Sequence, residues 1–312
     1  MEFREFGSSG LRVSVVGLGC NNFGGRIDIE TSRDVVHRAL DLGITFFDTA
    51  DVYGNRGGSE ECLGRLLGPH RRREVVIATK FGMPMRDGAP ERDASSGYVA
   101  QALEASLKRL NTDYIDLYQI HYPDPATPIE ETLTALDRLV REGKVRHVGC
   151  ANFRVWELVD GVRTADSLGL SRFVSCQNEY SLLVPDAEQE MMPMCANFGV
   201  GFLPYYPLAG GLLTGKYRRG APMPAGARLT GNARMSERYL TERNWTRVER
   251  FERFARERGR ALVELAFAYL LACDVIPSVI AGATTPGQVE ANVNASSWRL
   301  TAEDVEAIEA LY

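Results

Sequence analysis

Short apolar runs alternate with amphipathic helix patterns along nearly the whole chain, and this alternation restricts the possible folds more than any other feature. Runs typical of buried strands occur at residues 15–19, 45–49, 75–80, 114–121, 145–151, 173–178, 199–207 and 275–282. Helix patterns between and after them occur at residues 31–43, 59–67, 98–110, 128–142, 154–168, 186–198, 245–258, 260–272, 286–296 and 301–311. Eight strands alternating with helices predict an α/β fold of the (β/α)8 TIM-barrel type.

The segments outside this alternation also carry predictions. Residues 2–14 alternate apolar and polar around Gly-Ser-Ser-Gly, which predicts a β-hairpin before the barrel. Residues 214–243 are rich in Gly, Pro and Arg and show no clear period, so we expect a long flap over the strand ends, and 83–97 is expected to form another long loop there. A doubly wound sheet usually shows GxGxxG after its first strand, and residues 17–25 lack that spacing. We therefore expect one barrel domain over residues 1–312.

Composition narrows the class of protein further. The formal net charge of −5 argues against a nucleic-acid surface. The six cysteines form no CxxC pair and no metal-type spacing with the four histidines, so we expect free core cysteines, no metal and a reducing compartment. No signal-peptide pattern or membrane-length apolar run is present, and we expect a cytoplasmic protein without membrane partners.

Four ionisable residues follow or end successive predicted strands. Asp48, Lys80 and His121 each lie at the end of one, and Tyr53 follows Asp48 by five residues on a Gly-rich loop. Parallel strands in one sheet place their carboxyl ends at the same rim, where such folds carry their chemistry. Each residue alone has an ordinary structural explanation, as a loop cap, a turn tyrosine, a solvated strand end or a structural histidine. Their occurrence together favours a proton-transfer site.

The chemistry of this set fits carbonyl reduction or its reverse, alcohol oxidation. A tyrosine phenol has a pKa near ~10, and a neighbouring ammonium would lower it. Asp48 would hold Lys80 charged, Tyr53 would donate the proton, and His121 would orient the substrate oxygen or relay protons.

Several longer motifs in the same order resemble those of the aldo-keto reductases. They are GITFFDTADVYGNRGGSEECLG (43–64), LKRLNTDYIDLYQIHYPD (107–124), GKVRHVGCANF (143–153), QNEYS (177–181), YYPLAGGLLTGKY (205–217) and IAGATTPGQVEANV (280–293). The resemblance implies a barrel that binds NADP(H), less often NAD(H), with a catalytic tetrad at Asp48, Tyr53, Lys80 and His121. It also extends to the potassium-channel β-subunit branch, in which asparagine replaces the histidine. The retained His121 favours an ordinary enzyme.

The resemblance implies a set of contacts to the cofactor and to the substrate. Asn152 and Gln177 would hold the nicotinamide carboxamide, and Tyr205 would stack on the ring. The other residues expected beside the cofactor are Cys20, Asn21, Asp48, Pro207, Leu208, Gly210, Lys216, Arg228, Gly282, Thr284, Gln288 and Asn292. The residues expected beside the substrate are Asn22, Tyr53, His121 and Tyr122.

Three departures from the family pattern bear on the cofactor. Ala151 and Tyr206 stand where serines are usual, and Gly282 and Gln288 stand where many members carry a cation for the 2′-phosphate. Lys216 and Arg228 could compensate, so NADP(H) is favoured while NAD(H) stays open.

The leading hypothesis is a reductase of small aldehydes or ketones. The alternatives are a sugar (aldose) dehydrogenase using NAD(P) and a nucleotide-sensing regulatory subunit with little turnover. The sequence leaves open the natural substrate, the direction of the reaction and the oligomeric state.

Overall fold

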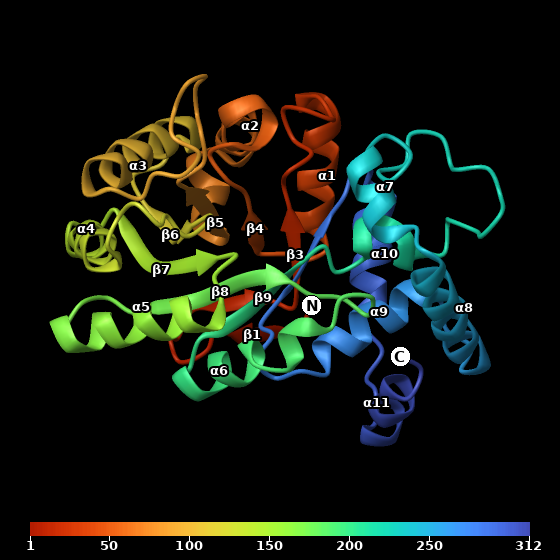
Figure 1. Cartoon of the computed structure of the whole chain (residues 1–312). Coiled ribbons are helices and arrows are strands. Elements are labelled where there is room, and N and C mark those ends of the chain that lie inside the picture. Colours follow the sequence, from red (N-terminus) through yellow and green to blue (C-terminus); the bar gives the residue numbers. More distant parts are fainter.

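A parallel sheet of eight strands forms the centre of the computed structural model, which describes residues 1–312 (Figure 1). In chain order the strands are β3 (Val16–Gly19), β4 (Phe46–Asp48), β5 (Val76–Phe81), β6 (Ile115–Ile120), β7 (Val145–Ala151), β8 (Phe173–Glu179), β9 (Gly201–Tyr205) and β10 (Val279–Gly282). They pair in the order β10-β3-β4-β5-β6-β7-β8-β9. The amide of Phe202 in β9 donates to the carbonyl of Val275 before β10, at 2.8 Å, which nearly closes the barrel. The predicted (β/α)8 fold is confirmed.

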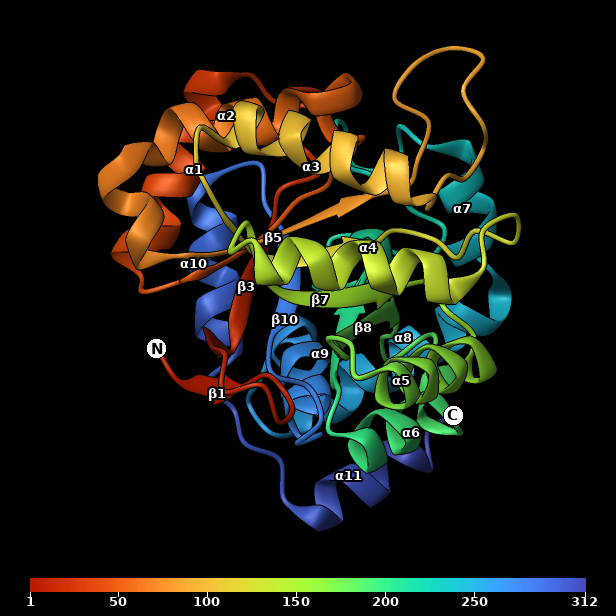
Figure 2. The ribbon, with the colours of Figure 1, turned by 90° about the vertical axis from the view of Figure 1, so that its left-hand side faces the viewer.

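Helices surround the sheet on its outer side, as Figures 1 and 2 show from two directions. They are α1 (Ile29–Asp41), α2 (Tyr53–Arg71), α3 (Ser96–Leu110), α4 (Ile129–Arg141), α5 (Val155–Leu168), α6 (Met191–Phe198), α7 (Ala233–Tyr239), α8 (Glu242–Glu257), α9 (Leu262–Leu271), α10 (Pro286–Ala295) and α11 (Ala302–Glu309). In α4 the apolar residues Leu133, Leu136 and Leu139 recur at helical spacing, and all three are buried. This spacing gives the helix the single apolar face that packs on the barrel.

The N-terminal hairpin closes the amino-terminal end of the barrel. Its strands β1 (Phe3–Glu5) and β2 (Arg12–Ser14) pair antiparallel, as expected. Phe6 lies edge-on to Phe46 of β4, with ring centroids 5.7 Å apart, in a small apolar cluster that also contains Ala78 and Leu117. Apolar side chains therefore fill this end of the barrel interior.

We call the apolar cluster around Phe6 and Phe46 the plug. Along β4 and β5, polar residues follow two positions after residues of the plug. Phe46 and Asp48 lie two positions apart on β4, and Ala78 and Lys80 lie two positions apart on β5. Alternate residues of a strand face the same side of the sheet, so Asp48 and Lys80 face the interior one layer above the plug. We call the end formed by the carboxyl termini of the eight strands the carboxyl rim.

Two predicted segments differ from the structure. Residues 214–243 were expected to lack regular structure, but they contain α7, which Asn232 caps by accepting from the Met235 amide at 3.0 Å. A seven-residue helix in a Gly- and Pro-rich segment is too short to give a periodic signal. The helix expected at 186–198 is instead a 3-10 turn at Asp186–Glu188 followed by α6.

The cysteine and membrane predictions can also be compared with the structure. All six cysteines are free, and all but Cys273 are buried. None of the helices combines the length and apolar character that a bilayer-spanning segment requires.

Candidate active site

Lys80 and Asp48 form a buried ion pair at the carboxyl rim. The Lys80 Nζ lies 2.9 and 2.8 Å from the two carboxylate oxygens of Asp48, and it also donates to the carbonyl of Thr49 at 2.9 Å. Lys80 is fully buried and Asp48 is 5% exposed. Three acceptors for the three N–H bonds of an ammonium hold this lysine charged and fixed in place.

Tyr53 reaches the same site from the loop that precedes the regular part of α2. Gly54, Asn55, Arg56 and Gly57 all have positive φ, so the chain turns sharply directly after the tyrosine. The ring of Tyr53 lies edge-on to that of His121, with centroids 5.7 Å apart, and the Lys80 Nζ lies 5.2 Å from the tyrosine ring centroid. The structure thus brings together all four residues of the predicted tetrad.

The pKa of Tyr53 differs from the expectation that Lys80 lowers it. Burial, and next the charge of Asp48, raises the pKa of Tyr53 well above its usual value. In the structure Lys80 faces the tyrosine ring, and Asp48 neutralises its charge. Tyr53 is therefore a neutral phenol at physiological pH, with a proton to donate.

His121 is a neutral imidazole in this environment. Burial, followed by the charges of Lys80 and Arg92, lowers its pKa well below the usual value. Its ring stacks on that of Tyr122, with centroids 5.4 Å apart, and its buried Nδ1 has no hydrogen-bond partner. A neutral imidazole is suited to orienting a substrate oxygen through a ring nitrogen.

The residues expected around a nicotinamide lie beside the tetrad and are connected to it by hydrogen bonds. Gln177 Nε2 donates to Asp48 Oδ1 at 2.9 Å. Asn152 Nδ2 donates to the backbone carbonyl of His121 at 2.9 Å, and Asn152 Oδ1 accepts from the Tyr205 hydroxyl at 2.9 Å. Three residues from β8, β9 and the β7–α5 loop are thus brought to the tetrad by the closure of the sheet.

Cations gather in and beside the β9–α7 connection, where the resemblance places the pyrophosphate. Burial, then the charge of Arg26, lowers the pKa of Lys216. Lys216 packs against Gly211, where φ is +98 and an added side chain would meet the lysine. No carboxylate pairs with Lys216 or Arg26. Neighbouring positive charges of this kind suit a phosphate ligand, so this part of the site fits a dinucleotide.

Tyr206 occupies this connection in place of the usual serine. Its φ is +52, and the Arg228 guanidinium lies over its ring at 5.2 Å from the centroid. The bulky residue therefore contacts the flap through a cation–π interaction. Among the other residues expected here, Pro207 is buried and Leu208 is partly buried, and a side chain at Gly210 would clash with Leu229.

The residues expected at the adenosine end surround the start of α10. Gln288 Oε1 accepts from both the amide and the hydroxyl of Thr284, at 2.8 and 3.2 Å. Gly282 lies beside the side chains of Asn21 and Asn22. Asn22, expected beside the substrate, donates to the carbonyl of Ala283 at 3.4 Å, so its side chain turns toward β10.

The remaining expected residues are buried. Cys20 is fully buried, with its pKa raised well above the usual value by burial and then by Asp48. Asn292 lies buried on α10.

Two features near the site were missed in the sequence. Asp51 is 1% exposed, and neither of its carboxylate oxygens has a partner. Burial, and next the charge of Glu60, raises the pKa of Asp51 to about 8. Glu179, at the end of β8, pairs with Arg238 and accepts from the Tyr239 hydroxyl, which ties α7 to the carboxyl rim. Asp51 lies inside the DTADVYG motif, whereas nothing in the sequence pattern indicates the Glu179 contacts.

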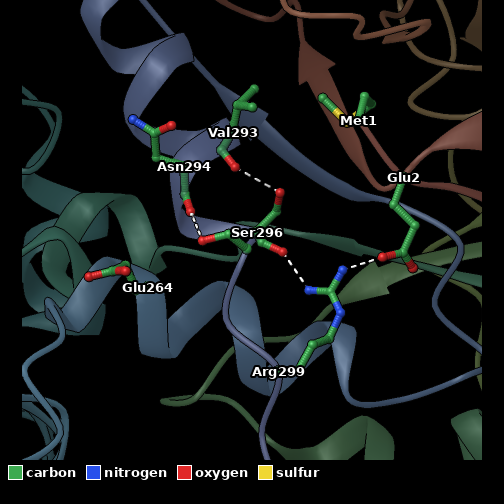
Figure 3. A pocket seen from close by; sticks show the side chains of 8 residues that line it. Met1, Glu2, Glu264, Val293, Asn294, Ser296 and Arg299 are labelled. Carbon is green, nitrogen blue, oxygen red and sulfur yellow. Dashed lines mark hydrogen bonds and ion pairs between the residues drawn. The ribbon is translucent and has the colours of Figure 1, made fainter.

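A polar hollow of ≈ 500 Å³ lies elsewhere on the molecule (Figure 3). Its lining consists of Met1, Glu2, Glu264, Val293, Asn294, Ser296, Ser297 and Arg299. Arg299 pairs with Glu2 and donates to the carbonyl of Ser296 at 2.5 Å, as Figure 3 shows. No residue of the predicted site lines this hollow, and its contacts tie the N-terminal strand to the loop after α10.

The fold and the site together define a class of protein. A (β/α)8 barrel with a lysine–aspartate pair, a neutral phenol and a neutral imidazole at its carboxyl rim has the groups that proton transfer to a carbonyl oxygen requires. The model of the Aldo/keto reductase family matches residues 15–312. The chain belongs to this family, whose members use nicotinamide cofactors.

Relatives with different names align with most of this chain. The uncharacterized oxidoreductase YrpG of Bacillus subtilis (strain 168) is 36% identical over 100% of this chain and 96% of its own. The L-glyceraldehyde 3-phosphate reductase of Escherichia coli (strain K12) is 36% identical over 95% of this chain and 87% of its own. A probable voltage-gated potassium channel subunit beta of Arabidopsis thaliana is 34% identical over 95% of this chain and 91% of its own.

Proposed function

We propose that the protein is an NADP(H)-dependent reductase that converts small aldehydes or ketones to alcohols, or catalyses the reverse reaction, with Tyr53 as the general acid or base. The observation that carries this proposal is the contact of the buried Lys80–Asp48 pair with both the Tyr53 ring and the Gln177 amide. This arrangement joins the proton donor to the expected nicotinamide position. A bound nicotinamide would supply or accept the hydride.

Tyr53 carries the proton in the proposed reaction. As hydride reaches the carbonyl carbon, negative charge develops on its oxygen, and the neutral phenol donates its proton there. The phenolate that remains lies next to the Lys80–Asp48 pair, whose ammonium is 5.2 Å from the ring centroid. His121, a neutral imidazole beside Tyr53, orients the same oxygen. In the oxidative direction Tyr53 takes the proton back from the alcohol.

The proposed preference for NADP(H) depends on cations outside the adenosine end. Gln288 bonds to Thr284, and no arginine or lysine stands at either 282 or 288. Arg228 and Lys216, which lie within the β9–α7 connection, are the cations that we assign to the cofactor phosphates, including the 2′-phosphate. A guanidinium can bind a phosphate through two parallel hydrogen bonds, which favours the phosphorylated cofactor.

The relatives support two different functions, and the composition of the site favours one of them. One relative is named a reductase of L-glyceraldehyde 3-phosphate and another a potassium-channel subunit. The complete tetrad, with His121 next to Tyr53, favours turnover over cofactor sensing.

The test is a fluorescence titration with NADPH and NADH, followed by an absorbance assay on a panel of aldehydes, ketones and aldoses. We expect NADPH to bind more tightly than NADH and to be consumed with small aldehydes. Tight NADPH binding without turnover of any carbonyl would instead indicate a nucleotide sensor. Oxidation of aldoses, without reduction of aldehydes, would identify a sugar dehydrogenase.

A further inference from the structure

A row of contacting side chains connects Tyr53, the proposed proton donor, to the guanidinium of Arg92. Tyr53 lies edge-on to His121, and the His121 ring stacks on Tyr122 at 5.4 Å and 20° between the planes. The guanidinium carbon of Arg92 lies 4.2 Å from the Tyr122 ring centroid. Arg92 belongs to the β5–α3 loop, which the sequence predicted would be long. The row therefore connects the reacting end of the site to a cation beyond it.

Contacts within the loop hold the guanidinium of Arg92 in place, but no carboxylate strongly neutralises its charge. Its Nη1 donates to the carbonyl of Glu91 at 2.7 Å and contacts the sulfur of Met83 at 3.1 Å. The nearest carboxylate oxygen with which it pairs belongs to Glu91, 3.6 Å away, and that side chain is 88% exposed. A solvent-exposed pair of this length contributes little, so Arg92 keeps a positive charge available to a ligand.

The other cations near the reacting end already have roles. Asp48 neutralises Lys80, and we assign Arg228, over Tyr206, to the cofactor. Arg92 has neither role, and its only aromatic partner, Tyr122, is the neighbour of His121 in the chain. The guanidinium therefore adjoins the tetrad through Tyr122 and has no other assigned role.

We propose that the protein prefers short-chain carbonyl substrates that carry a terminal oxyanion, a carboxylate or a phosphate, and that Arg92 binds this oxyanion beside the ring of Tyr122. This inference rests on the proposed reductase function and specifies its substrate class. Arg92 offers the planar pair of N–H donors that carboxylates and phosphates bind. The Tyr122 ring keeps the guanidinium in position, so that less freedom is lost when the anion binds.

Matched pairs of aldehydes test the proposal by kinetics. The pairs are succinic semialdehyde with butanal, and glyceraldehyde 3-phosphate with glyceraldehyde, so that the carboxylate and phosphate are tested separately. The wild-type protein, with saturating NADPH, is expected to show at least about tenfold higher kcat/KM for one charged member than for its neutral partner. In Arg92→Met this preference falls by about tenfold or more, to near equality, through KM, the neutral members are unaffected, and Arg92→Lys retains part of it.

Arg86→Met is the matched control, because Arg86 lies in the same loop and its side chain is exposed. It is expected to behave as the wild type. Equal kcat/KM values within both pairs, or an equal loss for charged and neutral members in Arg92→Met, would overturn the proposal.

Calorimetry provides a readout that does not require turnover. Glycerol 3-phosphate, succinate and glycerol are titrated into the protein saturated with NADP⁺. The proposal expects binding of an anion that Arg92→Met removes and Arg86→Met keeps. Anion binding of this kind without reduction of any aldehyde would leave the oxyanion site standing and refute the reductase function. Reduction of neutral aldehydes without anion binding would leave the reductase function standing and refute the site.

Discussion

Gln177 Nε2 donates a hydrogen bond of 2.9 Å to Asp48 Oδ1, the same carboxylate that pairs with Lys80. One buried carboxylate therefore connects an amide of the expected nicotinamide site to the lysine beside the proton donor. Because Gln177 uses its N–H for this contact, its carbonyl oxygen remains available to a carboxamide. The carboxylate of Asp48 thus contacts both the expected cofactor side and the proton-transfer side of the site.

Replacement of Tyr53 by phenylalanine is expected to remove the proton donor while keeping the ring. We expect kcat for aldehyde reduction to fall by at least ~100-fold, since general acid catalysis contributes about 10²–10⁴-fold. The dissociation constant for NADPH should stay nearly unchanged, because the ring contacts with His121 and Lys80 remain. Steady-state kinetics and a fluorescence titration measure the two quantities. Wild-type rates in this variant would show that Tyr53 is not the general acid.

Replacement of Asp48 by asparagine would leave a buried ammonium at Lys80 without its counterion. Removal of one partner of a buried ion pair costs about 3–5 kcal/mol of stability. We therefore expect a clearly lower free energy of unfolding in urea. The double variant Asp48→Asn/Lys80→Met should recover part of this loss, because it no longer buries an unpaired charge. A single variant as stable as the wild type would show that Lys80 is solvated or neutral in the folded protein.

Asp51 should make the stability depend on pH. Burial, followed by the charge of Glu60, raises the folded pKa of Asp51 to about 8, whereas the unfolded value is about 3.9. Between these values the folded state keeps a proton that the unfolded state has lost. This contribution to stability is therefore fully present below pH ~4 and is lost as the pH rises toward about 8.

Asp51→Asn should remove this part of the pH dependence. From pH 5 to pH 8 we expect the Tm of the wild type to fall relative to that of the variant. Asp113→Asn, at an exposed aspartate, is the control. Parallel Tm curves for the wild type and Asp51→Asn would indicate that Asp51 is already ionised in the folded protein.

Arg228→Ala tests the cation assigned to the phosphorylated cofactor. Loss of a charged hydrogen bond of about 1.5–3 kcal/mol should weaken NADPH binding by roughly 10- to 100-fold and NADH binding by less. Arg234→Ala, at an exposed arginine in α7, serves as the control. The measurement is the dissociation constant of each cofactor by fluorescence titration. An equal loss for both cofactors would assign Arg228 to the shared pyrophosphate.

Local sequence patterns were sufficient to predict the barrel and to place three of the predicted tetrad residues at strand ends. Each strand is a short apolar run with local boundaries, and its two-residue period fixes which side chains face the interior. The positions of Asp48, Lys80 and His121 at the ends of strands were therefore predictable from nearby residues.

The interactions of these residues depend on the tertiary structure. Gln177 and Asp48 lie 129 positions apart and meet only because the sheet closes. The raised pKa of Tyr53 depends on burial by several loops, which overrides the expected effect of Lys80. The contact of Arg92 with Tyr122 and the turn of Asn22 toward β10 likewise join separate loops. Local patterns fix which strand positions face the interior, but distances, burial and charge pairing arise between segments that the sequence keeps apart.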